Sequence, residues 1–192
     1  MPNNNYAENL FISSGAILNG HFQLTSGLHS PVYWEKFRIL QYPEYTSQLC
    51  QMIATNFSND EVEVVIGPTT GGIILSYEVA RYLGTRGIFA EKIANGSRAL
   101  KRGFEIKPGE RVLLVDDVFT TGKSIMEVVD VINRSRGKLV GIGVLVDRSE
   151  KPLGIDIPVY SCIRSETITY RSDKCPLCEQ GVPLVKPGSS EV

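Results

Sequence analysis

Residues 112–124 read VLLVDDVFTTGKS, and this stretch decides the fold class of the chain. Its first four residues, VLLV, form an uninterrupted apolar run, which is typical of a strand buried on both faces of a parallel sheet. Two adjacent acids, Asp116 and Asp117, follow, and a turn of small residues then opens a segment with helical apolar spacing. A buried strand, a polar turn and a helix in this order indicate an α/β protein.

The same alternation of strand and helix extends on both sides of this stretch. Five short β-branched or apolar runs predict a central parallel sheet, with strands at Val62–Ile66, Gly87–Ala90, Arg111–Val115, Leu139–Val146 and Val159–Ile163. Helical apolar spacing predicts helices at Pro43–Phe57, Gly72–Leu83 and Ser124–Ser135. His21–Trp34 alternates weakly and contains Ser-Gly and Ser-Pro breaks, which indicates hairpin-like strands outside the main sheet.

The composition excludes several classes of protein. The chain has 192 residues, of which 42% are hydrophobic and 21% charged, as expected for a globular protein with a sizeable core. The formal net charge is -1, so no overall field attracts nucleic acid or an anionic membrane, and we expect neither as a partner. The opening residues lack a secretory signal and no run is long enough to span a membrane, which predicts a cytoplasmic protein.

The turn after the acid pair has the chemistry of an anion site. Backbone N–H groups of Thr120–Ser124 would point at one spot, reinforced by the positive end of the following helix and by three hydroxyl groups. These donors suit a phosphate monoester, while Asp116 and Asp117 would accept hydrogen bonds from sugar hydroxyls or order a hydrated Mg2+. A Walker loop also ends in Gly-Lys-Ser, but its first glycine is absent. A plain helix-starting turn with surface acids is the alternative interpretation.

Residues 112–124 resemble the phosphoribosyl diphosphate signature of the type I phosphoribosyltransferases. The resemblance implies that the two acids bind the ribose hydroxyls and that the turn closes around the 5-phosphate. Ile66–Gly72, IGPTTGG, is similar to the pyrophosphate loop of the same family. The implied phosphoribosyl diphosphate-binding residues are Lys92, Asp116, Asp117, Val118, Phe119, Thr120, Thr121, Gly122, Lys123, Ser124, Thr69, Thr70 and Gly71. The implied cofactor is Mg2+, held mainly through the substrate rather than by protein ligands.

Three further stretches resemble the orotate branch of that family. They are Phe22–Tyr33 (FQLTSGLHSPVY), Val146–Arg148 (VDR) and the tail segment CPLCEQGVPLVKPGS. The resemblance implies that Thr120, Arg148 and Tyr33 bind orotate, with the Arg148 guanidinium as partner of the substrate carboxylate. It also implies a homodimer and a type I phosphoribosyltransferase fold. Residues 1–42 would form a hood segment contributing to the base site, 43–170 the core, and 171–192 a tail packing near the hood.

The loop that supplies catalytic cations in this family matches poorly. Lys92 aligns with it, but Glu91 stands where the family has an arginine, and Asn95–Phe104 contains no histidine. We therefore assign the catalytic residues as Asp116, Asp117 and Lys92. Three other cations, namely Arg98, Lys101 and Arg102, form a basic cluster suited to a diphosphate, or else a solvated loop.

Cys175 and Cys178 form a single C-x-x-C pair, which is half of a zinc site or a redox motif. The remaining candidate ligands, Cys50, Cys162, His21 and His29, are far away in sequence and lack ligand spacing. The spacing therefore predicts no metal site, and the four cysteines are expected as reduced thiols. His29 would face the substrate or be a satisfied histidine of the interior.

These patterns, taken with the resemblance to the orotate branch, imply transfer of ribose 5-phosphate from 5-phosphoribosyl 1-diphosphate to orotate. One alternative is a purine phosphoribosyltransferase, which would have no need for Arg148. Another is a non-catalytic regulator that senses phosphoribosyl diphosphate and binds RNA, which would require a basic face.

Overall fold

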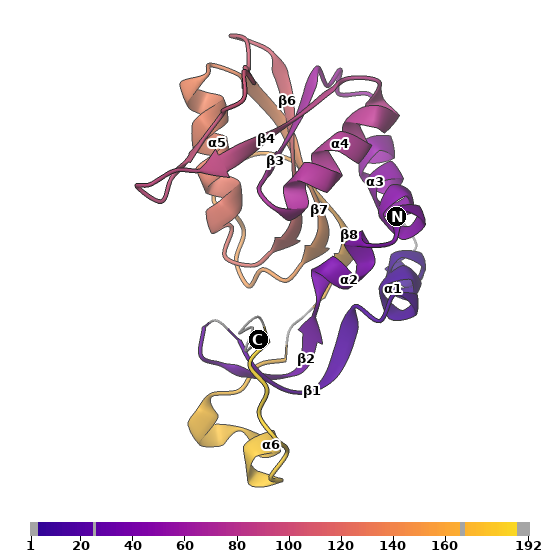
Figure 1. Cartoon of the computed structure of the whole chain (residues 1–192), viewed down its shortest axis with the longest axis vertical. Coiled ribbons are helices and arrows are strands. Elements are labelled where there is room, and N and C mark those ends of the chain that lie inside the picture. The colour runs from indigo at the N-terminus through magenta and orange to yellow at the C-terminus, as the bar shows by residue number, and fades with distance from the viewer. Residues whose placement is uncertain (1–3, 25, 166–167, 188–192) are drawn as a thin grey trace.

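A six-stranded sheet lies at the centre of the computed structural model, which describes residues 4–24, 26–165 and 168–187 (Figure 1). The strands lie in the order β5-β4-β3-β6-β7-β8. All neighbours run parallel except β5, which pairs antiparallel with β4. Their bounds are β3 Val64–Pro68, β4 Arg86–Lys92, β5 Arg98–Ala99, β6 Arg111–Phe119, β7 Lys138–Asp147 and β8 Val159–Arg164.

Helices cover both faces of the sheet. This arrangement explains why residues 112–115 of β6 are all apolar. Leu113 and Val115 pack on one face with α3 (Pro43–Asn56) and α4 (Gly71–Leu83), whereas Val112 and Leu114 pack on the other with α5 (Lys123–Arg134). All four side chains are fully buried, because successive residues of a strand point to opposite faces. The helices are α1 Asn4–Ser13, α2 Lys36–Leu40, α3 Pro43–Asn56, α4 Gly71–Leu83 and α5 Lys123–Arg134.

The strand order reverses between β3 and β6, and this point positions the site. From β3 the chain passes through α4 to β4, while from β6 it passes through α5 to β7 on the other side. Open parallel sheets bind ligands at the carboxyl ends of their strands beside such a reversal. β6 pairs with β3 only as far as Leu114, and then continues along β7 to Phe119. The last residues of β6 therefore lack a partner on the side of β3.

A smaller unit, which we call the hood, lies apart from the sheet. It is the antiparallel hairpin of β1 (Ile17–Gln23) and β2 (His29–Trp34). The C-terminal tail runs along both of its strands, since Tyr170 bridges to His29 and Val185 bridges to Phe22. Figure 1 shows the hood and the tail together at one end of the molecule. The tail contains the short helices η1 (Ser172–Lys174) and α6 (Pro176–Glu179).

The expectation of a five-stranded parallel sheet flanked by helices is confirmed, with the small antiparallel β5 added at one edge. The third strand was expected to end at Val115, but it continues through the acid pair because β7 supplies a partner as far as Phe119. The helix α1 was not expected. Its Ala7, Leu10 and Phe11 pack in the same core cluster as α3, so this part of the first 42 residues joins the core.

Within the described ranges, no helix combines the length and the apolar character needed to cross a bilayer.

The buried apolar strands predict a matched pair of stability effects. Val144→Ala removes a fully buried side chain from β7, so we expect a loss of about 2 kcal/mol in the free energy of unfolding, measured by urea titration. Val159→Ala changes the same residue type on the neighbouring β8, where the side chain is 43% exposed, and should cost much less. Equal losses in the two variants would contradict this assignment of the core.

Candidate active site

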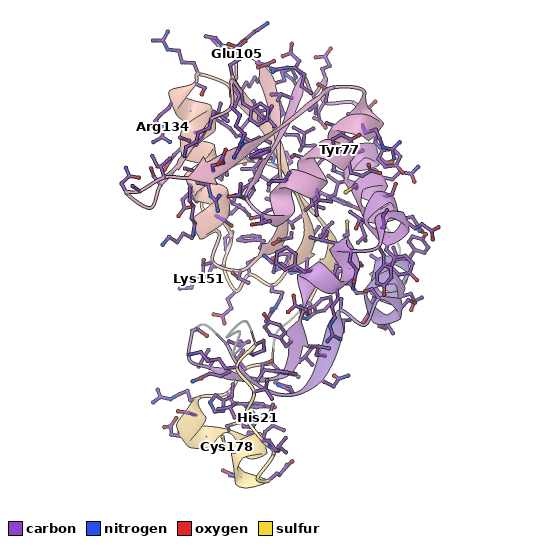
Figure 2. The ribbon with its side chains drawn as sticks, in the orientation of Figure 1. His21, Tyr77, Glu105, Arg134, Lys151 and Cys178 are labelled. Carbon is purple, nitrogen blue, oxygen red and sulfur yellow. The ribbon has the colours of Figure 1, made fainter. Side chains whose placement is uncertain are left out.

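A cleft of about 1000 Å³ lies where the carboxyl ends of the central strands face the hood. Figure 2 shows Lys151, one of its lining residues, at the edge of the core that faces the hood. The cleft collects predicted site residues from four separate segments of the chain. These are Tyr33, Thr69, Thr70, Gly71, Asp116, Asp117, Val118, Thr120, Thr121, Ser124 and Arg148.

The acid pair forms the buried floor of the cleft. Asp116 and Asp117 are each only 4% exposed, although both side chains carry ionisable groups. Asp116 accepts two hydrogen bonds, from the Ser124 hydroxyl at 2.7 Å and from the backbone N–H of Asp117 at 2.9 Å. Burial and the neighbouring Asp117 carboxylate nevertheless raise the pKa of Asp116 to about 6. The pair therefore concentrates negative charge on the floor of the cleft, where it attracts hydrogen-bond donors and cations.

Lys36 is a site residue that the sequence did not indicate. It begins α2, and its ammonium lies 2.8 Å from one oxygen of Asp117 and 2.9 Å from the other. Its side chain is 37% exposed and also lines the cleft. No motif marked Lys36, because 81 residues separate it from its partner. Its position three residues after Tyr33, which the orotate resemblance had singled out, was the available signal.

The turn after β6 places hydroxyl groups beside the acids. Thr120 and Thr121 are exposed in the cleft, and Ser124 connects the turn to Asp116 through its hydroxyl group. Gly122 has a φ of 76°, and a Cβ at this position would collide with Leu153, so the turn requires glycine. Helix α5 starts at the next residue, Lys123, and directs its positive end towards the turn.

Three of the implied binding residues between Asp116 and Ser124 do not line the cleft. Phe119 is buried in the core cluster beneath α5, which anchors the end of β6. Gly122 is buried as well, and Lys123 is exposed outside the lining. After the acid pair, this segment therefore lines the cleft with Val118 of β6 and with Thr120, Thr121 and Ser124 of the turn.

The loop between β3 and α4 forms the opposite wall. Its Thr69, Thr70 and Gly71 line the cleft, and the peptide bond between Thr69 and Thr70 is cis. Gly71 approaches the acid pair so closely that a Cβ at this position would collide with the Asp117 carboxylate. The glycine is thus needed for the contact between this loop and β6.

Arg98 supports this loop and also lines the cleft, although only 4% of its surface is exposed. Its guanidinium donates to the Thr69 hydroxyl at 3.1 Å and to the Ala90 carbonyl at 3.1 Å. It also forms an ion pair with Glu127 of α5, with an N–O distance of 3.1 Å. Arg98 is therefore not part of a solvated loop, and its charge is already matched by Glu127.

The far end of the cleft carries a half-buried arginine beside an aromatic ring. Arg148 follows β7 and lies at half-burial, and its backbone N–H donates to the Phe119 carbonyl at 2.8 Å. Desolvation lowers the pKa of Arg148, while the nearby Tyr33 opposes that shift. Burial raises the pKa of Tyr33 in turn. An arginine at this depth suits a flat anionic ligand group.

The other predicted cations lie outside this cleft. Lys92 ends β4 and is exposed, as are Lys101 and Arg102. Arg102 donates to the Glu91 carboxylate at 2.7 Å, and none of the three residues lines the cleft among the described residues. The structure therefore does not bring them together with the acid pair of the same chain.

Known proteins share both this sequence and this architecture. Residues 44–178 match the family model described as the phosphoribosyl transferase domain. The protein named orotate phosphoribosyltransferase of Pelotomaculum thermopropionicum is 49% identical over 183 residues, covering 95% of this chain and 96% of its own. The protein of that name from Desulforamulus reducens is also 49% identical, covering 95% of both chains. The chain belongs to the orotate phosphoribosyltransferase family.

Solved structures agree with this family. The crystal structure of orotate phosphoribosyltransferase from Aeropyrum pernix is 27% identical, with a TM-score of 0.66, and the match covers 82% of this chain and 93% of that chain. The Mycobacterium tuberculosis enzyme of the same name, solved with inorganic phosphate, has a TM-score of 0.67 at 21% identity, covering 84% of this chain and 96% of that chain. At that identity the likeness supports the fold alone.

The raised pKa of Asp116 predicts a pH-dependent gain in stability for Asp116→Asn. The pKa of Asp116 is near 3.8 in the unfolded chain and about 6 in the folded chain, so the folded chain binds this proton more tightly. The stability that the bound proton contributes is fully present below about pH 3.8 and is lost as pH rises through about 6. The amide avoids this penalty and can still bond to Ser124. We expect the variant to gain up to about 3 kcal/mol at pH 8 and to lose this advantage towards pH 4, measured by denaturant titration at both pH values.

Asp130→Asn is the control for this measurement. It removes an exposed acid from α5 in the same region of the fold. A gain that is the same at both pH values, or that also appears in the control, would contradict the burial argument.

Proposed function

We propose that this protein transfers the ribose 5-phosphate group of 5-phosphoribosyl 1-diphosphate to orotate. The products are orotidine 5-phosphate and diphosphate, a step of de novo pyrimidine (UMP) biosynthesis. One observation carries the proposal: a single cleft holds an acid pair, a hydroxyl-rich turn and an arginine, all in a chain about half identical to named orotate phosphoribosyltransferases.

The sugar phosphate would lie along the carboxyl end of β6. Asp116 and Asp117 offer acceptors for the two ribose hydroxyls, and Thr120, Thr121 and Ser124 offer donors for the 5-phosphate beside the first turn of α5. The diphosphate would then lie along the loop of Thr69–Gly71 on the opposite wall. This arrangement spans the cleft with one substrate molecule and leaves the anomeric carbon facing the hood.

The donors fit Mg2+ that arrives with the substrate. Carboxylate oxygens are the ligands that this cation prefers, but all four oxygens of the acid pair already accept bonds from Lys36, Ser124 or the backbone. We therefore propose that Mg2+ is held mainly through oxygens of the substrate. Neutralisation of the departing diphosphate is the chemistry that the bound ion would supply.

Orotate would occupy the end of the cleft beside the hood. Its carboxylate matches the guanidinium of Arg148, while Tyr33 and Thr120 would contact the pyrimidine ring. A purine has no carboxylate and would leave the half-buried Arg148 without this ligand. The guanidinium of Arg148 therefore favours orotate over the bases that purine phosphoribosyltransferases use.

Catalysis needs placement and charge neutralisation more than a strong base. The bond from the anomeric carbon to the diphosphate breaks as the pyrimidine nitrogen approaches, and the sugar carries positive charge in between. Asp116 and Asp117 would stabilise that charge. We assign a cationic role to Lys92 as well. Because Lys92, Lys101 and Arg102 lie outside the cleft of their own chain, we propose a homodimer in which this loop serves the other subunit.

Cytoplasmic location and the absence of nucleic-acid and membrane partners stay predictions of the sequence.

The close contact at Gly71 predicts a binding defect. Gly71→Ala would push the Asp117 carboxylate out of place, so we expect the affinity for phosphoribosyl diphosphate with Mg2+ to fall at least about tenfold in calorimetry. The melting temperature should show a folded variant, with some loss because the displaced carboxylate also pairs with Lys36. Unaltered affinity in a folded variant would show that the loop and the acid pair do not act on one substrate.

Arg148→Ala tests the identity of the base. Diphosphate release would be measured from phosphoribosyl diphosphate and Mg2+ with orotate, uracil, adenine, hypoxanthine, guanine and xanthine offered separately. We expect turnover with orotate alone, and kcat/KM for orotate at least about tenfold lower in the variant because the carboxylate loses its partner. Arg164→Ala, an exposed arginine at the end of the adjacent β8, should leave kcat/KM unchanged.

The other outcomes are equally informative. Turnover with a purine would overturn the assignment of the base while keeping the phosphoribosyl site. Silence with every base, together with binding of phosphoribosyl diphosphate, would favour the non-catalytic regulator.

A further inference from the structure

Four potential metal ligands converge at the junction of the hood and the tail. His21 comes from β1, His29 from β2, and Cys175 and Cys178 from the two ends of the C-P-L-C segment around α6. Their ligand atoms all lie within 4.8 Å of one another. Figure 2 shows His21 and Cys178 together in the unit formed by hood and tail, well away from Lys151 at the cleft.

The spacing of these atoms resembles the edges of a coordination tetrahedron. The distance from His21 Nε2 to His29 Nδ1 is 2.9 Å, and Cys178 Sγ lies 3.3 Å from His29 Nδ1. His21 Nε2 lies 3.5 Å from Cys175 Sγ and 3.7 Å from Cys178 Sγ. Around a tetrahedral Zn2+, the bond lengths imply about 3.3 Å between two nitrogens and about 3.6 Å between nitrogen and sulfur. Each of these four distances is within about half an ångström of those values, and the remaining two pairs of ligand atoms lie within 4.8 Å.

The backbone selects the protonation state that a metal requires. His21 Nδ1 lies 2.8 Å from the carbonyl oxygen of Val182, which can only accept a hydrogen bond. Nδ1 therefore carries the proton, and Nε2 directs its lone pair into the cluster. A carbonyl that holds the outer nitrogen of a histidine is the usual outer partner of a metal-binding imidazole.

A metal-free network does not satisfy this arrangement. Three groups approach the single lone pair of His21 Nε2: the ring nitrogen of His29 and the thiols of Cys175 and Cys178. If His29 Nδ1 donates to that lone pair, neither thiol finds a ring nitrogen to accept its proton. If His29 Nδ1 instead accepts from Cys178, the lone pairs of the two ring nitrogens face each other at 2.9 Å. A cation at the centre accepts a lone pair from each of the four atoms at once.

We propose that His21, His29, Cys175 and Cys178 bind one structural Zn2+ ion. Two nitrogens and two sulfurs form a ligand set that favours zinc over hard cations such as Mg2+. His21, His29 and Cys175 are each at most 3% exposed, and four protein ligands leave no open position for a substrate. Both cysteines bind as thiolates, so their two protons pass to solvent when the ion binds.

The ion would fasten the tail to the hood behind one wall of the cleft. The hairpin turn between its two histidines contributes Leu24, Ser26 and Leu28 to the cleft lining. The tail contributes Thr169 and Pro187 on either side of the cysteine pair. Hydrogen bonds already tie the two segments, from Val185 N–H to the His21 carbonyl and from Tyr170 N–H to the His29 carbonyl, at 2.8 Å each. The ion therefore stabilises the shape of the cleft wall without touching the substrate.

The direct test is the metal content of the full-length chain. We expect about one Zn2+ per chain by elemental analysis after purification without chelator or nickel column. Replacement of the ion by Co2+ should give the intense visible bands of a tetrahedral site and the near-ultraviolet absorption of a thiolate ligand. The variant Cys175→Ser/Cys178→Ser should lose at least about nine-tenths of the bound metal and both spectral features. Cys50→Ala, which removes a buried thiol elsewhere, should retain them.

The cobalt spectrum of the unchanged chain keeps the test decisive even if the double variant folds poorly. A folded, reduced chain that binds neither ion, an octahedral cobalt spectrum, or a Cys175–Cys178 disulfide in freshly isolated protein would each overturn the proposal. These readouts do not depend on the proposed reaction. If that reaction is also correct, removal of the ion should raise KM for orotate more than it lowers kcat, because only the wall of the cleft is loosened.

Discussion

The acid pair of β6 is the constraint on which the rest of the structure depends. Two adjacent carboxylates are 4% exposed at the centre of the molecule, where charge is costly. Each surrounding feature reduces that cost: the hydroxyl group of Ser124, the backbone N–H of Asp117 and the ammonium of Lys36. The raised pKa of Asp116 shows that the compensation is incomplete. The folded chain therefore carries an electrostatic strain that a polar ligand would relieve.

The position of the pair follows from the topology of the sheet. β6 needs β3 on one side and β7 on the other to bury its apolar half, but the pairing with β3 ends at Leu114. Pairing with β7 continues to Phe119, so the acids are held in strand geometry on one side only. The loop that contains Gly71 fills the other side, and it can approach closely because Gly71 has no side chain. The order of the strands, the length of β6 and the glycine at position 71 together define the cleft.

The sequence predicted those features that depend on neighbouring residues. VLLVDDVFTTGKS contains a strand, its acids and its turn within thirteen residues, and alternation of strands and helices gave the parallel sheet. It did not reveal Lys36 as a partner of Asp117, because 81 residues separate them. The same reason applies to Arg98, which looked like part of a basic loop and is instead buried against Thr69 and Glu127. His21 and Cys175 lie 154 residues apart, and only the pairing of the tail with the hood brings them together.

Arg98 joins the loop that precedes α4 to the helix α5. Its guanidinium bonds to Thr69 on one side and to Glu127 on the other, and its own carbonyl accepts a bond at 2.8 Å from Arg134 at the end of α5. The two walls that would hold the opposite ends of a substrate are thus joined through one interior side chain. Such a brace resists any separation of the walls during a catalytic cycle. Any adjustment of the cleft to its ligands would then fall to the wall formed by the hood rather than to these two walls.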